Sequence, residues 1–193
     1  MLDGQLESQA FNAAVRADVA EAMFGKPLVT NVFRSLLVEA MIAKALGPEW
    51  RWCAADFAAW DLEHESGCRL EVKQSAARQS WSQPGGGSSS PRFDIAYRKG
   101  RWDGSSWIEG RARHAHAYVF AFHPLAGEAA DHRRAEQWRF YPVLTSALPG
   151  AASISLERLG QLAAACVVTD LEAQVRALLH TKSGSPGPYA MGG

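Results

Sequence analysis

Residues 60–75 hold two short strand-like runs separated by a Ser-Gly dipeptide, and this stretch constrains the fold more than any other. Side chains of a strand alternate between its two faces, so Glu71 and Lys73 are expected on one face and the apolar residues beside them on the other. If the two runs pair as a hairpin, Asp61 approaches the same edge. The stretch therefore predicts two carboxylates and an ammonium group in one small volume, which is the composition that a hard divalent cation and an attacking water need.

The whole chain has the composition of an ordinary globular domain. Of its 193 residues, 47% are hydrophobic and 21% are charged, and a chain of this length can bury a substantial core without disulfides. We predict one domain over residues 1–180 and a flexible tail over 181–193, where Gly and Pro are frequent. The cysteines, Cys53, Cys68 and Cys166, are odd in number and far apart, which favours neither a disulfide framework nor a zinc site.

Location and charge give weaker constraints. No apolar run approaches the length that crosses a bilayer, and the polar, acidic first ten residues lack the order of a secretory signal. We therefore predict no membrane partner and a cytoplasmic location. The 20 basic and 20 acidic residues give a net charge of zero, but residues 69–139 carry 12 basic and 7 acidic side chains, a net charge of +5. A basic central segment beside an acidic site is compatible with a polyanionic substrate.

Two helices are predicted before the hairpin. Apolar residues four apart, from Phe11 to Met23, predict a helix over 2–24 that packs through this stripe. A second, largely buried helix is expected from Thr30 or Asn31 to Leu46, and its apolar run is interrupted by Glu39. Two interpretations of Glu39 remain open: an ordinary solvated glutamate, or an acid that belongs with the hairpin.

The remaining elements indicate the fold class. Strand-like runs cover residues 50–53, 92–97, 115–123 and 138–144, and helices follow to His180. The run at 115–123 lacks polar alternation, as expected for a central strand covered on both faces. We predict an α/β or α+β layered domain with a central mixed sheet of four to five strands flanked by helices.

The order of the acidic residues adds a family resemblance. Glu39 on a helix, Asp61 at the start of a strand and the triplet Glu71-Val72-Lys73 on the next strand together resemble the PD-(D/E)XK nuclease superfamily. In that superfamily a helix supplies a Glu, a strand start an Asp, and the next strand (Asp/Glu)-x-Lys. Trp60 stands where that signature has Pro. The resemblance covers about residues 30–145 and implies a restriction-endonuclease-like core.

Further segments are similar to an uncharacterised bacterial branch of this superfamily. They are Glu71-Val72-Lys73-Gln74-Ser75-Ala76, Gln79-Ser80-Trp81, Arg92-Phe93-Asp94-Ile95 and Trp138-Arg139-Phe140-Tyr141.

The resemblance implies a metal-dependent deoxyribonuclease with DNA as substrate and Mg²⁺ as cofactor, with Mn²⁺ as a substitute and no organic cofactor. Asp61 and Glu71 would hold the ion, with the Val72 carbonyl as a further ligand, because Mg²⁺ prefers few carboxylates plus water and phosphate oxygens. Lys73 would orient the attacking water and offset charge on the phosphate. Glu39 would be an additional ligand, directly or through water.

Several alternatives stay open at this point. Asp61, Glu71 and Lys73 are also compatible with a surface hairpin that carries an ordinary ion pair. The chain could be a catalytically silent protein of the same fold that binds nucleic acid or protein. The small size favours a homodimer, since a lone domain of this kind has little surface for recognition. The pair His114 and His116 suggests zinc ligands, but a third ligand is not well placed in the sequence.

Overall fold

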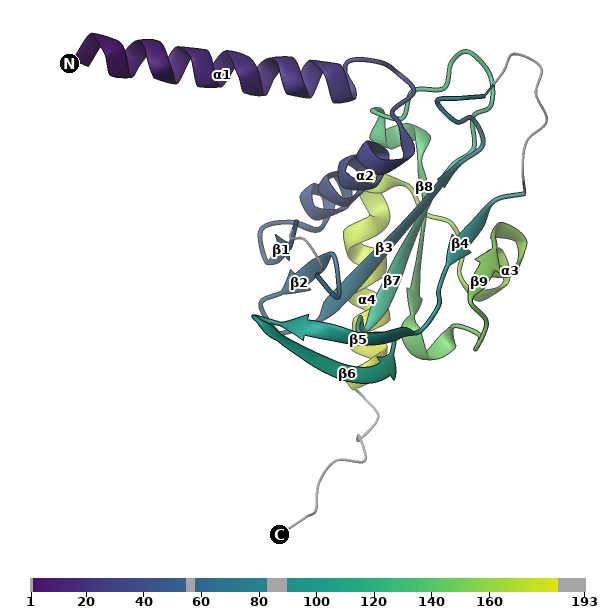
Figure 1. Cartoon of the computed structure of the whole chain (residues 1–193). Coiled ribbons are helices and arrows are strands. Elements are labelled where there is room, and N and C mark those ends of the chain that lie inside the picture. The colour runs from purple at the N-terminus through teal and green to yellow at the C-terminus, as the bar shows by residue number, and fades with distance from the viewer. Residues whose placement is uncertain (1, 55–57, 83–89, 184–193) are drawn as a thin grey trace.

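A five-stranded mixed sheet forms the centre of the molecule (Figure 1). The computed structural model describes residues 2–54, 58–82 and 90–183. In spatial order the strands are β1 (Trp50–Trp52), β2 (Leu62–His64), β3 (Arg69–Ala76), β7 (Ala117–His123) and β8 (Arg139–Leu144). The pairs β1–β2, β2–β3 and β7–β8 are antiparallel, whereas β3 and β7 run parallel. The predicted layered class and the number of sheet strands are confirmed.

The predicted hairpin is the β2–β3 pair. Leu62 lies opposite Leu70, and the chain reverses through a turn in which Gly67 has a φ of +81°. Only glycine adopts that left-handed conformation without strain, so the Ser-Gly dipeptide fixes the position of the turn. The His64 amide donates to the Cys68 carbonyl at 2.8 Å and closes it.

Helices α2 (Asn31–Leu46) and α4 (Leu171–Ser183) cover one face of the sheet. Val38 and Ile42 of α2 pack there against Leu70 and Val72 of β3 and against Val119 of β7. Each fully buried aliphatic side chain of this kind contributes about 1.5–3 kcal/mol. This packing holds α2, and therefore Glu39, against the strand that carries the other predicted site residues.

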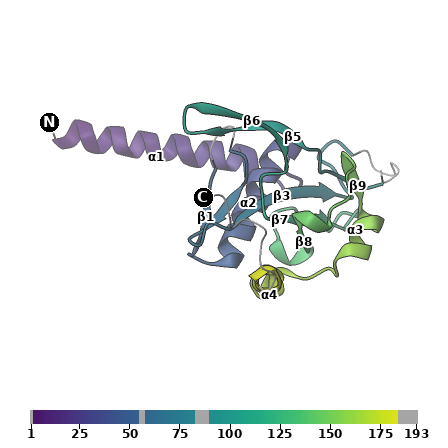
Figure 2. The same ribbon diagram turned by 90° about the horizontal axis from the view of Figure 1, so that it is seen from below.

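The opposite face is covered by shorter elements. The strands β4 (Arg92–Asp94) and β9 (Ser153–Ser155) pair with each other, and α3 (Leu156–Leu162) follows β9. Phe93, Ile154 and Leu159 from these elements pack on Phe120 of β7. A second hairpin, β5 (Arg98–Asp103) with β6 (Ser106–Ala112), lies on the same side of the sheet, opposite α4 (Figure 2).

Short connections complete the chain. They are the 3₁₀ helices η1 (Ala135–Gln137), η2 (Thr145–Ala147) and η3 (Val168–Asp170). The strand β7 is buried along its whole length and lies between β3 and β8, as its unbroken apolar run predicts. Pro142 lies in β8, at one end of the sheet order, where a missing amide hydrogen is tolerated.

The first helix corrects one prediction. The helix α1 (Leu2–Phe24) forms where expected, but it extends away from the sheet (Figure 1) and leaves Phe11 69% exposed, with Val15 and Val19 exposed beside it. The prediction that this stripe packs on the domain is therefore wrong. Periodicity tells which face of a helix is apolar, but it does not supply a partner for that face.

The last helix ends at Ser183, three residues beyond its predicted end at His180. Residues 184–193 lie outside the described part of the chain. Among the described residues, none of the helices combines the length and the apolar character that a bilayer crossing requires.

Candidate functional site

Asp61 is fixed by backbone hydrogen bonds on both sides. It directly precedes β2, where its amide donates to the Leu70 carbonyl at 2.9 Å and its carbonyl accepts from the Cys53 amide at 2.8 Å. Its side-chain Oδ2 accepts from the Val72 amide at 2.6 Å. The carboxylate is therefore held against the edge of β3, beside Glu71 and Lys73.

Glu71 and Lys73 share one face of β3, as strand alternation predicts. Both side chains are half-buried, and Lys73 Nζ donates to Glu71 Oε1. The parallel register places Tyr118 beside Glu71 and Phe120 beside Lys73 on the neighbouring strand β7. The bulky rings keep the surroundings of the ion pair partly dry, which strengthens its electrostatic interactions.

Glu39 reaches the same region from α2. Its Oε2 accepts a hydrogen bond from the Trp52 indole Nε1 at 3.0 Å, and Trp52 belongs to β1. The side chain is half-buried and interacts electrostatically with Glu71 and Lys73. Glu39 is therefore not a fully solvated side chain: its direct partner is Trp52 of β1, and it acts on the hairpin residues through its charge.

The electrostatics of this cluster are unbalanced. Burial, together with the nearby charges of Glu71 and Glu39, raises the pKa of Asp61 to about 7, against the opposing effects of the Val72 hydrogen bond and Lys73. Burial also raises the pKa of Glu39. We call Glu39, Asp61, Glu71 and Lys73 the acidic cluster: three carboxylates share one ammonium group, an arrangement in which a further cation is stabilising.

The acidic cluster offers a metal ion few side-chain ligands. In the described ranges, no three His, Cys, Asp or Glu side chains are grouped as ready ligands for one ion. Mg²⁺ does not require such a group, because it keeps several waters and is held by one or two carboxylates. Asp61 and Glu71 each engage one oxygen in the contacts above and have a second one, so their chemistry fits this ion.

The histidines on and near β7 do not form the zinc site considered from the sequence. The His116 Nδ1 accepts from the Arg69 amide at 3.0 Å, so this ring nitrogen supports the strand edge. His123 lies at the other end of β7, where its Nε2 hydrogen-bonds the Gln137 side-chain oxygen at 3.0 Å. Each ring has a separate structural role.

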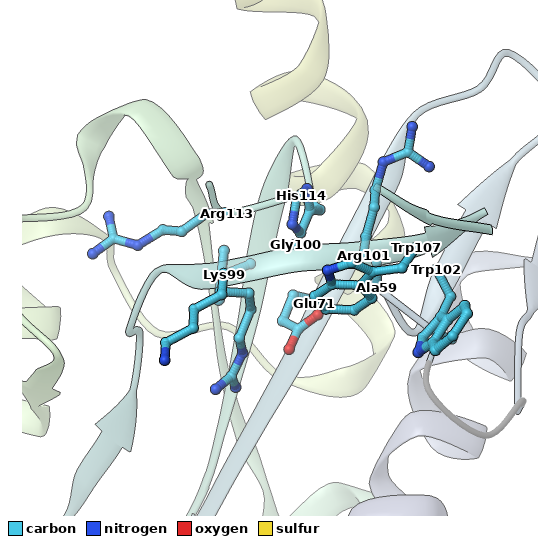
Figure 3. A pocket seen from close by; sticks show the side chains of 12 residues that line it. Ala59, Glu71, Lys99, Gly100, Arg101, Trp102, Trp107, Arg113 and His114 are labelled. Atoms are coloured by element: carbon cyan, nitrogen blue, oxygen red, sulfur yellow. The ribbon is translucent and has the colours of Figure 1, made fainter. Parts of the chain in front are cut away.

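A pocket opens beside Glu71, and sequence reasoning missed most of its lining. The cavity measures about 310 Å³ and lies between Glu71 and Tyr118 on the sheet and the β5–β6 hairpin (Figure 3). Four Lys or Arg side chains and one carboxylate line it. A sequence signal for the hairpin exists: the dipeptide Gly104-Ser105, which forms the turn between the paired residues Asp103 and Ser106, is typical of tight hairpin turns.

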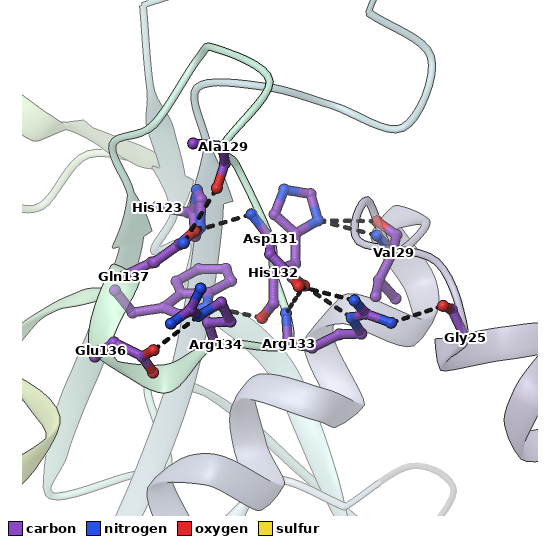
Figure 4. A network of polar contacts seen from close by, with 11 residues as sticks. Gly25, Val29, His123, Ala129, Asp131, His132, Arg133, Arg134, Glu136 and Gln137 are labelled. Carbon is purple, nitrogen blue, oxygen red and sulfur yellow. Dashed lines mark hydrogen bonds and ion pairs between the residues drawn. The ribbon is translucent and has the colours of Figure 1, made fainter.

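A second polar cluster lies at the far end of β7. We call it the histidine cluster, and its members are His123, His132, Gln137 and Trp138 (Figure 4). His132 is fully buried. Its Nδ1 accepts from the Val29 amide at 3.1 Å, and its Nε2 bonds the Arg78 carbonyl at 3.0 Å. Those two partners define a neutral ring, and burial lowers its pKa to about 4.

Gln74, the residue after Lys73, lies outside the acidic cluster. Its side chain points to the α2 side of the sheet, where its Oε1 accepts from Arg34 Nε at 2.6 Å and its amide donates to Asn31 Oδ1 at 2.9 Å. These bonds join the start of α2 to β3.

Comparisons with known protein families, with curated proteins and with solved structures gave no match to this chain. A function for this protein is therefore inferred from the geometry of the acidic cluster and of the pocket beside it.

Proposed function

We propose that the protein is a Mg²⁺-dependent hydrolase of DNA phosphodiester bonds, with its site at the acidic cluster. The observation that carries this proposal is the convergence of Glu39, Asp61 and Glu71 from three elements around Lys73. Concentrated carboxylates beside one ammonium are costly in a folded protein, and such groups occur mainly where chemistry uses them.

Each residue of the cluster has a role in this proposal. Asp61 and Glu71 would hold the ion with the Val72 carbonyl, and Glu39 would act through water. Mg²⁺ supplies Lewis-acid stabilisation of the phosphoryl oxygens. Lys73, held beside Glu71, positions the attacking water and donates to a phosphate oxygen as negative charge develops there.

The surroundings of the cluster support a polyanionic substrate. The pocket beside Glu71 is lined by Arg98, Lys99, Arg101 and Arg113. Arg113 is used structurally, since its guanidinium donates to the Ile95 and Pro149 carbonyls at 2.7 and 2.6 Å. The net positive charge of this lining attracts phosphates toward the carboxylates, which on their own would repel them.

A plasmid-nicking assay with Mg²⁺ tests the proposal. Lys73→Ala and Glu71→Ala should each slow nicking by about 10²–10⁴-fold, the range for losing a group that transfers or positions a proton. Glu65→Ala is the matched control, because Glu65 is an exposed acid in the turn of the same hairpin, and it should cut like the wild type. Equal nicking by all four proteins would overturn the assignment of the site.

A catalytically silent nucleic-acid or protein-binding module is the second candidate. The specific observation in its favour is that Lys73 already neutralises Glu71, as in an ordinary structural ion pair. Calorimetric titration separates the candidates: the hydrolase should bind Mn²⁺ or Mg²⁺ in a manner that Asp61→Asn abolishes, whereas a silent module should bind an oligonucleotide and no divalent ion. The predicted homodimer can be checked by light scattering on the same samples.

A further inference from the structure

Two tryptophans face each other across the β5–β6 hairpin. Trp102 lies opposite Trp107 in the strand pairing, with ring centroids 5.5 Å apart and planes at 65°. The two residues are 45% and 46% exposed, although large aromatic side chains are usually well buried. An edge-to-face pair cannot cover all four ring faces, so aromatic surface remains available on the hairpin.

The backbone of β5 is adapted to place these groups. A Cβ on Gly100 would lie 2.4 Å from the Ile108 carbonyl oxygen and 2.6 Å from Trp107 Cζ2, so only glycine permits the Trp107 ring to rest there. The strand pairing also shifts between Arg98 and Gly100: Arg98 pairs with Ala112 and Gly100 with Glu109, so Lys99 lies opposite the two β6 residues Gly110 and Arg111, which form a bulge. Bulges of this kind redirect a side chain, and they are frequent beside active sites.

Gly100 and Lys99, at these two irregular positions, both line the pocket beside Glu71. Trp102, Trp107 and Lys99 line the cavity together with Glu71 (Figure 3). Arg98 lines it too and is paired with Asp94 at 2.8 Å. The cavity thus combines flat aromatic surface and basic groups with one carboxylate of the acidic cluster.

We propose that the β5–β6 hairpin binds an unpaired nucleobase beside Glu71, so that the preferred substrate is DNA with a single-stranded segment at the cleavage point. This inference rests on the proposed function, because it names the substrate of the same site. Within a duplex both faces of a base are covered by its neighbours, so only an unpaired or unstacked base can stack on an indole ring. Lys99 then contacts the backbone of the same strand, and the adjacent phosphate lies toward Glu71.

Anisotropy with a short labelled single strand, in Ca²⁺ without Mg²⁺ to prevent cutting, tests the stacking role. Trp107→Ala should weaken binding about tenfold, the effect of losing one stacked base, and Trp107→Phe should retain most of the affinity. The wild type should bind the single strand more tightly than the blunt duplex of the same sequence. Tighter binding of the duplex would overturn the inference.

An abasic oligonucleotide separates stacking from support of the hairpin. If Trp107 stacks on a base, Trp107→Ala should have no further effect on a strand that lacks bases at the contact. An equal loss on intact and abasic strands would mean that the indole only stabilises the hairpin, and the inference would be wrong. Trp81→Ala is the matched control, since Trp81 is 66% exposed but lies past the C-terminal end of β3, and it should bind like the wild type.

The same samples distinguish failure of the inference from failure of the proposed function. A wild type that nicks DNA while Trp107→Ala keeps full affinity for single strands would overturn the hairpin site and leave the hydrolase standing. A wild type that neither nicks nor binds any DNA would overturn both.

Discussion

The acidic cluster and the histidine cluster lie toward opposite ends of the parallel pair β3–β7, and they differ in how their polar groups are partnered. In the histidine cluster donors meet acceptors: His132 uses both ring nitrogens, and Trp138 Nε1 donates to the His132 carbonyl at 2.9 Å. In the acidic cluster three carboxylates depend on Lys73. The histidine cluster carries no excess of one charge, although His123 Nδ1 is buried without a hydrogen-bond partner, whereas the acidic cluster carries an excess of negative charge.

This difference separates a structural polar site from a functional candidate. Both clusters contain strongly shifted groups, since the pKa of His132 is lowered to about 4 and that of Asp61 is raised to about 7. Burial is the largest cause in each case. For His132 the neutral form that is present at pH 7 makes both ring hydrogen bonds, so the fold is destabilised only at acid pH. For Asp61 the like charges of Glu71 and Glu39 remain, so its ionised form destabilises the fold near and above pH 7.

The largest expected effect comes from neutralising the acidic cluster. Asp61→Asn keeps an oxygen that can accept from the Val72 amide but removes one of three repelling charges. Nicking should fall about 10²–10⁴-fold, while at pH 8 the free energy of unfolding should rise by about 1–2 kcal/mol, which raises Tm by roughly 2–8 °C for a chain of this size. Nicking and thermal unfolding on one preparation check both effects. A variant that is less stable than the wild type would contradict the charge-crowding argument.

A substitution in the histidine cluster should lower the stability of the protein and leave nicking unchanged. His132→Ala leaves the Val29 amide and the Arg78 carbonyl without their partner inside the protein. The free energy of unfolding should fall by about 2–4 kcal/mol, since each unsatisfied buried group costs about 1–3 kcal/mol. Tm should then drop by roughly 4–16 °C. Nicking by the folded variant at low temperature should match the wild type, and a selective loss of nicking would show that this cluster is not purely structural.

The pH dependence of stability provides a further test of the difference between the two clusters. The His132 pKa is about 4 in the folded protein against a usual value of 6.5, with the nearby Arg34 and His123 adding to the effect of burial. The unfolded chain therefore binds the proton first. The stability that the neutral ring contributes is full above pH 6.5 and is lost as the pH falls toward 4, by at most about 3 kcal/mol.

Urea unfolding across that range checks this expectation. His132→Gln should lose stability less steeply than the wild type between pH 6.5 and 4. His180→Gln, which changes an exposed histidine on α4, should follow the wild type. Parallel curves for all three proteins would mean that His132 does not cause the acid sensitivity.

The sequence was sufficient to predict those elements whose residue pattern is local. The β2–β3 hairpin, the helix α2 with Glu39 and the covered strand β7 all follow from periodicity and turn residues. The helix α2 is less buried than predicted, since Val32 and Leu36 are exposed. The histidine cluster could not be found in this way, because Val29 and His132 are 103 residues apart and meet only when the sheet forms. For α1 the apolar stripe was read correctly, but its packing depends on a partner surface that the stripe does not encode.

The β5–β6 hairpin was not predicted from the sequence, for a different reason. Its Gly104-Ser105 turn is a local signal, yet the sequence pattern predicts a strand only over 92–97, whereas β5 begins at Arg98. The bulge opposite Lys99, at Gly110 and Arg111 of β6, breaks the alternation by which strands are recognised.

The smallest expected effect concerns a third group of charges, on the hairpin itself. Arg51 bonds Glu63 at 2.5 Å, and Glu63 also accepts from Arg69 at 3.0 Å, so Glu63 keeps a cationic partner without Arg51, which is exposed. Arg51→Ala should change the free energy of unfolding by about 0–1 kcal/mol, with less effect in high salt, and should leave nicking unchanged. Thermal unfolding at low and high salt measures it. If this variant instead lost activity as Asp61→Asn does, charge on the hairpin in general, rather than the crowded carboxylates, would control the reaction.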